Sequence, residues 1–159
     1  MKLRTIAGLA AGLLLAGCAG EPQVPPRPAF YQDLAAGGQL DAASALSIIN
    51  DYRRANGLGA LNWDAALASE AESEARRHAA ADGLLTSGTK ERQAAARSAV
   101  RRSVSGGYHS FADAFSGWRG SPAHDSVLRE PQGEAIGIAA VARPGSRHRV
   151  YWVVLVRRR

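Results

Sequence analysis

The chain has 159 residues, a formal net charge of +6 and a single cysteine. This length suits one domain with one hydrophobic core, and a single cysteine excludes an intramolecular disulfide framework. An export signal at the N-terminus argues against a nucleic-acid partner, although the chain is basic.

Residues 1–17 have the pattern of a bacterial export signal. Lys2 and Arg4 precede an apolar stretch of about ten residues, which is too short to span a bilayer as a helix. The stretch ends in Leu-Ala-Gly-Cys at positions 15–18, which resembles the lipobox of bacterial lipoproteins. We therefore expect Cys18 to be acylated, with palmitate or a similar chain, and to anchor the protein in a membrane of the cell envelope. An ordinary secretory signal with an accidental cysteine is the alternative.

Residues 18–29 form the predicted tether between this anchor and the domain. Four prolines at positions 22, 25, 26 and 28 favour an extended polyproline II course and disfavour helix or sheet. The remaining residues, 30–159, are then the folded domain.

Two amphipathic helices are predicted first along the domain. Asp41 is a good N-cap for a helix over residues 42–55, which Gly57 closes. Asp64 caps a second helix that runs to about residue 82. In this second helix Glu74 and His78 form an i, i+4 pair, which predicts that His78 is a surface residue rather than a ligand.

The second half of the domain changes from helix to strand. We predict a polar, basic helix over residues 89–102 and a short helix that begins at Ser110. Residues 135–141 and 150–156 are rich in strand-forming side chains and flank a turn at 143–146, so they predict an antiparallel hairpin. The resulting fold class is α+β, with helices packed on an antiparallel sheet. Trp63 and Trp152 are expected to be buried.

Five short motifs in the same order resemble the CAP superfamily, which unites cysteine-rich secretory, antigen 5 and pathogenesis-related 1 proteins and whose domain is also called SCP. They are the Asn50–Leu58 stretch, Trp63-Asp64 with Leu67, the W-x-x-S-P-x-H stretch at 118–124, Gly137-Ile138, and Tyr151-Trp152-Val153. The resemblance covers about residues 42–156 and implies an α-β-α sandwich.

The same resemblance implies a cleft that pairs two histidines with acidic residues, and this chain lacks most of it. His124 occupies one histidine position, whereas the stretch at 84–88 that matches the other contains no histidine. Arg102 stands where the family places a glutamate. One imidazole without neighbouring ligands binds zinc weakly, and a nearby arginine repels a cation, so we expect no metal, no cofactor and no catalytic residue.

One other motif suggests an enzyme. Ser87 and Lys90 fit the S-x-x-K pattern of penicillin-binding enzymes, but the partner motifs are absent and the chain is small for that fold. We interpret the match as coincidental.

The leading hypothesis is a lipid-anchored domain on the periplasmic face of the inner or outer membrane that binds a small ligand, a lipid or a protein partner without catalysis. The predicted groove contains Trp118, Ser121 and His124, with Arg102 as a contact for an anionic or cell-wall ligand. A role for His124 in packing or capping is equally compatible with its position. A hydrolase of cell wall or peptides that uses His124, and a purely structural envelope protein, are the alternatives.

Overall fold

The computed structural model describes residues 27–85 and 98–159. The signal, Cys18, most of the tether and the S-x-x-K motif lie outside these ranges. No helix in the described part is long and apolar enough to cross a membrane.

A four-stranded sheet in the order β1-β3-β4-β2 forms the centre of the domain. The strands are β1 (Asn62–Trp63), β2 (Val100–Gly106), β3 (Gly133–Ala142) and β4 (Val150–Arg158). β2, β4 and β3 pair antiparallel, whereas β1 runs parallel to β3. The sheet is therefore mixed rather than purely antiparallel. The parallel strand β1 has only two residues, and the sequence analysis did not predict it.

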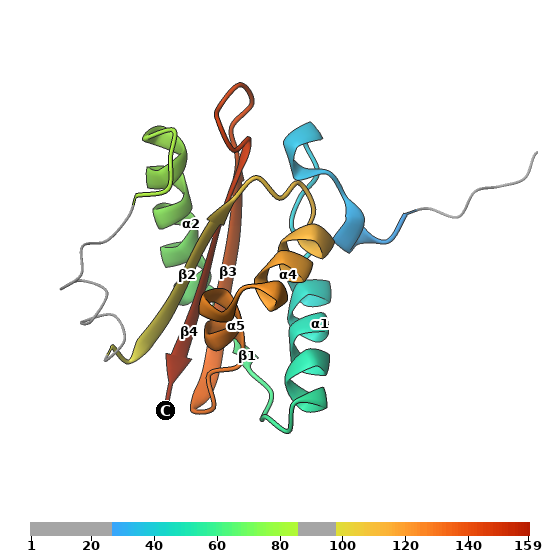
Figure 1. Ribbon diagram of the computed structural model, residues 1–159, viewed down its shortest axis with the longest axis vertical. Coiled ribbons are helices and arrows are strands. Elements are labelled where there is room, and N and C mark those ends of the chain that lie inside the picture. Colours follow the sequence, from blue (N-terminus) through green and yellow to red (C-terminus); the bar gives the residue numbers. More distant parts are fainter. Residues whose placement is uncertain (1–26, 86–97) are drawn as a thin grey trace, which may run out of the picture.

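Helices cover both faces of this sheet (Figure 1). α2 (Ala65–Ala80) lies on one face, and α1 (Ala42–Ala55), α4 (Phe111–Gly120) and α5 (Pro122–Leu128) lie on the other. Two short 3-10 helices, Ala29–Tyr31 and Leu34–Ala36, precede α1. The arrangement is the expected α-β-α sandwich.

Local capping sets the start of the helices as expected. The carboxylate of Asp41 accepts hydrogen bonds from two backbone N–H groups at the start of α1, and Asp64 does the same for α2. The Ser110 hydroxyl caps α4 by accepting from the backbone N–H of Asp113. These bonds satisfy N–H groups that have no partner inside the helix.

The predicted hairpin is confirmed as β3 and β4, and its inner strand β4 is buried on both faces. Val150, Trp152, Val154 and Val156 pack toward α1, α4 and α5, and Val153 and Leu155 pack toward α2. Trp152 is fully buried, as expected, but Trp63 is only half-buried at the sheet edge.

The helix predicted over residues 89–102 is wrong at its C-terminal end, because β2 begins at Val100. Residues 86–97 lie outside the described ranges. β2 alternates side chains between the two faces: Val100 and Val104 pack toward α2, and Ser105 faces α4. The polar members of this alternation weaken the strand signal in the sequence, and pairing with β4 over seven residues decides the conformation.

Candidate functional site

Three of the four residues predicted to line a groove lie on α4, on α5 and at the junction between these helices. Trp118 is 1% exposed, and its indole N–H donates to the Ser105 hydroxyl at 2.8 Å. Its burial assigns Trp118 to the core rather than to an open surface. Ser121 links the two helices, since its backbone N–H donates to the Trp118 carbonyl and its carbonyl accepts from Asp125.

His124 is half-buried on α5, the helix that packs on β2 and β4. Its Nδ1 atom is buried and has no hydrogen-bond partner among the described residues. Burial lowers the pKa of His124 below the ordinary value for histidine. Burial at this position therefore favours the neutral imidazole over the imidazolium.

Arg102, the fourth predicted residue, lies on the opposite face of the sheet. Its guanidinium forms an ion pair with Glu74 of α2 at 2.8 Å. The predicted groove would need Arg102 and His124 on one surface, but the alternation of β2 directs Arg102 toward α2 while α5 covers the other face.

The prediction that His78 is a surface residue is wrong. This residue is 2% exposed, and its Nδ1 atom accepts a hydrogen bond from the backbone N–H of Leu85 at 2.9 Å. Nδ1 therefore carries no proton, and Nε2 faces the Glu74 carboxylate at 3.4 Å. His78 is buried because the alanines of α2 bring this helix close to β3 and β4, which places positions 74 and 78 between the helix and the sheet.

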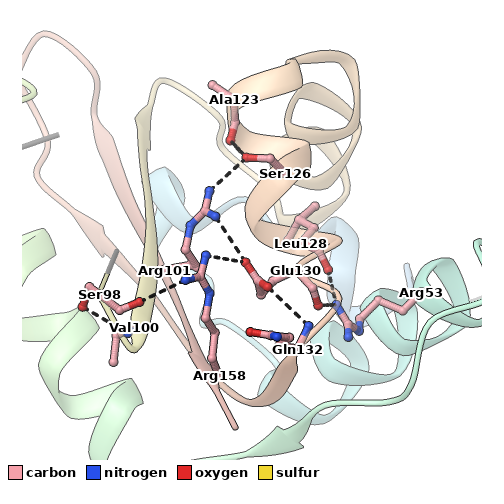
Figure 2. Close-up of polar contacts among 10 residues, drawn as sticks. All are labelled: Arg53, Ser98, Val100, Arg101, Ala123, Ser126, Leu128, Glu130, Gln132 and Arg158. Carbon is pink, nitrogen blue, oxygen red and sulfur yellow. Dashed lines mark hydrogen bonds and ion pairs between the residues drawn. The ribbon is translucent and has the colours of Figure 1, made fainter. Parts of the chain in front are cut away.

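A buried charge cluster that the sequence analysis missed lies on the α5 side, around Glu130. Glu130 is 4% exposed. Its carboxylate accepts hydrogen bonds from Arg101 of β2 at 3.2 Å and from Arg158 of β4 at 3.0 Å. Figure 2 shows both guanidinium groups converging on it. The adjacent backbone N–H of Gln132 also donates to this carboxylate.

Arg53 of α1 approaches the same loop from the other side (Figure 2). It is fully buried and donates to three backbone carbonyls, those of Gly59, Leu128 and Glu130. Burial lowers the pKa of Arg53, and the negative charge of Glu130 opposes this shift. Arg53 thus joins the end of α1 to the loop between α5 and β3.

An open pocket of about 510 Å³ lies beside this cluster, along the outer side of α5. We call it the α5 pocket. Its charged lining residues are Arg101, Asp125, Arg129 and Glu130, and the others are Leu58, Pro122, Ser126 and Pro131. Asp125 accepts from the Tyr52 hydroxyl at 2.7 Å and pairs with Arg129 at 3.4 Å.

Two guanidinium groups and two carboxylates line this pocket, and a third guanidinium lies behind it. Arg101 pairs with Glu130, Arg129 pairs with Asp125, and Arg158 of β4 also pairs with Glu130. The partly exposed guanidinium groups of Arg101 and Arg129 can donate hydrogen bonds to an anion. Within residues 27–85 and 98–159, no group of three or more His, Cys, Asp or Glu side chains could hold a metal ion.

The fold and the order of motifs define a domain of the CAP type. The family model for the cysteine-rich secretory protein family, CAP, matches residues 46–156. The chain therefore belongs to the cysteine-rich secretory protein family. A comparison with curated proteins found no match.

Solved bacterial structures share the fold. An outer surface protein from Borrelia burgdorferi is 19% identical, with a TM-score of 0.57 over 76% of this chain and 97% of its own. A cysteine-rich secretory protein from Staphylococcus aureus is 17% identical, with a TM-score of 0.56 over 74% of this chain. An extracellular protein with an SCP domain from Bacillus anthracis is 14% identical, with a TM-score of 0.58 over 74% of this chain. This chain spans only 38% and 40% of the last two.

Proposed function

We propose that the protein is a lipoprotein of the bacterial cell envelope whose CAP domain binds an anionic ligand in the α5 pocket without converting it. The lipobox-like end of the signal supports the anchor. The names of two similar structures, an outer surface protein and an extracellular protein, support an envelope location.

Two partly exposed guanidinium groups in the pocket are the observation that supports an anionic ligand. Arg101 and Arg129 line the pocket, and their side chains are 24% and 46% exposed. Guanidinium groups bind carboxylates and phosphates in a bidentate way, which fits the acidic fragments of bacterial cell wall. Arg101 takes here the role that the sequence analysis gave to its neighbour Arg102.

The state of the pocket carboxylates supports binding without catalysis. Asp125 accepts from Tyr52 and Arg129, and Glu130 accepts from two arginines and a backbone N–H. A general base needs a carboxylate or imidazole within reach of a substrate proton. Both carboxylates are engaged by internal donors, and His124 is not among the residues that line the pocket.

Calorimetric titration with soluble muropeptides and with inorganic phosphate tests this proposal. We expect the parent protein to bind, and Arg129→Ala to weaken binding at least about tenfold, or about 1.4 kcal/mol. Arg54→Ala is the control, because Arg54 is exposed, pairs with Asp51 and is not among the residues that line the pocket.

Equal affinity of the Arg129→Ala variant would refute the pocket assignment. Cleavage of the muropeptides that disappears in His124→Ala would instead support a hydrolase. Absence of binding by the parent protein to either probe would favour a structural role.

A further inference from the structure

The edge of the sheet at β3 is only partly covered. β1 pairs with Ala135 and Ile136 and then ends, because the chain turns at Asp64 into α2. β3 continues to Ala142. Among the residues that the structure describes, no strand lies beside the edge from Ile138 to Ala142.

The pairing pattern shows which main-chain groups this edge presents. Arg143 donates to the carbonyl of Arg149 across the hairpin, whereas the carbonyl of Ile136 accepts from Asp64 on the β1 side. Main-chain groups alternate sides along an antiparallel strand. The N–H and C=O groups of Ile138 and Ala140 therefore point away from β4, into the space beyond the end of β1.

This space is a recessed slot of about 390 Å³. We call it the edge slot. One wall is the first half of α2, the other is the start of α1, and half-buried Trp63 lines the slot beside them. The lining residues are Leu40, Ala42, Trp63, Ala65, Ala68, Ser69, Glu72, Ile138, Ala139 and Ala140.

The shape and charge of the edge slot select its occupant. The edge lies between two helical walls, and its main-chain groups at Ile138 and Ala140 suit a single extended segment. Five alanines keep the slot wide enough for small apolar side chains. Glu72 is the only charged lining residue; its half-exposed carboxylate pairs with Arg76 and can also accept from a cationic side chain of the segment.

We propose that the edge slot binds an extended peptide segment of a partner protein, which adds to the sheet as a strand beside β3. Main-chain hydrogen bonds to Ile138 and Ala140 provide affinity, and small apolar side chains with a Lys or Arg near Glu72 provide selectivity. The free edge of five residues accommodates a segment of roughly 16 Å. This site is separate from the α5 pocket and does not rest on the function proposed there.

Selection of displayed random heptapeptides on the full chain tests the proposal, with Cys18→Ser included to prevent acylation. Two adjacent alanines in the first turn of α2 provide matched variants. Both are exposed, but only Ala65 lines the slot. We expect selected peptides to lose at least tenfold in affinity for Ala65→Phe and to bind Ala66→Phe like the parent.

A backbone measurement separates strand addition from other binding. On addition of a selected peptide, hydrogen exchange should slow at the amides of Ile138 and Ala140, and N-methylation of the peptide should abolish binding. Arg129→Ala should bind the peptide normally, which distinguishes this site from the α5 pocket. Failure to enrich peptides on the parent over Ala65→Phe, or unchanged exchange at both amides, would overturn the proposal.

Discussion

Several buried polar side chains in this domain have hydrogen-bond or ion-pair partners far away in the sequence. Arg53 donates to three backbone carbonyls, Glu130 forms ion pairs with two arginines, and the indole N–H of Trp118 donates to the Ser105 hydroxyl. A buried polar group without such a partner costs about 1–3 kcal/mol. These contacts therefore add specificity to the packing of α1, α4 and α5 on the sheet.

Substitution of Arg53 should test this directly. Arg53→Met removes the donor for three backbone carbonyls, and we expect the free energy of unfolding to fall by roughly 3–5 kcal/mol. Urea denaturation measures the change. Arg54→Met should stay within about 0.5 kcal/mol of the parent, because Arg54 is exposed and pairs only with Asp51. Similar losses in the two variants would contradict the role of Arg53.

The lowered pKa of His124 predicts a pH dependence of stability. Burial lowers the pKa of His124 in the folded state, so the unfolded chain binds a proton first as the pH falls below the ordinary histidine value of about 6.5. Stability is therefore lost between this pH and the lower pKa of the folded state. Urea denaturation from pH 7.5 to 5 should show a shallower decline for His124→Asn than for the parent. Identical slopes would show that His124 does not titrate differently on folding.

At the scale of elements, the close approach of α2 to the sheet depends on small residues. Ala71 and Ala75 are fully buried in this interface, and Gly137 of β3 lies directly under the start of the helix. A methyl group at Gly137 would overlap backbone atoms of Leu67 and Ala68. The same close approach buries Glu74 and His78.

Gly137→Ala should therefore displace α2. Backbone atoms cannot give way as a flexible side chain can, so we expect a loss of about 3 kcal/mol or more in the free energy of unfolding. Gly120→Ala is the control, since a methyl group at Gly120 meets nothing within 4 Å. Thermal unfolding followed by circular dichroism compares the two. A parent-like melting temperature for Gly137→Ala would mean that α2 lies farther from the sheet.

At the scale of the whole molecule, the proposed anchor and the tether limit where the domain can act. Pro28 lies ten positions after Cys18, and a proline-rich chain extends by about 3.1 Å per residue. The domain would then stay within roughly 30 Å of the membrane. Ligands for the α5 pocket and the edge slot would have to reach that layer.

Cell fractionation of Cys18→Ser tests the anchor. Without acylation, the protein should move from the membrane fraction to the soluble fraction or remain unprocessed, whereas Ala19→Ser should fractionate like the parent. Washing with high salt removes proteins held only by basic side chains, because salt screens exposed charges. A mature Cys18→Ser protein that stays with membranes after this wash would refute lipid anchoring.

The sequence alone was enough to predict the local features and the family. The caps at Asp41, Asp64 and Ser110 act over two or three residues, and the hairpin is encoded by strand formers around one turn. Such short-range patterns remain readable without knowledge of the fold. The five ordered motifs indicated the CAP family, and the match over residues 46–156 confirmed it.

Only the tertiary structure decided which polar side chains meet. Arg101 and Glu130 are 29 residues apart, and Arg53 and Glu130 are 77 apart, so no local pattern could pair them. Pairing with β4 stabilises residues 100–102 as a strand. Because side chains alternate along this strand, Arg102 pairs with Glu74 on one face and Arg101 pairs with Glu130 on the other. Neighbouring residues of a strand face opposite sides of the sheet. The proposed binding pocket therefore contains Arg101 and not the predicted Arg102.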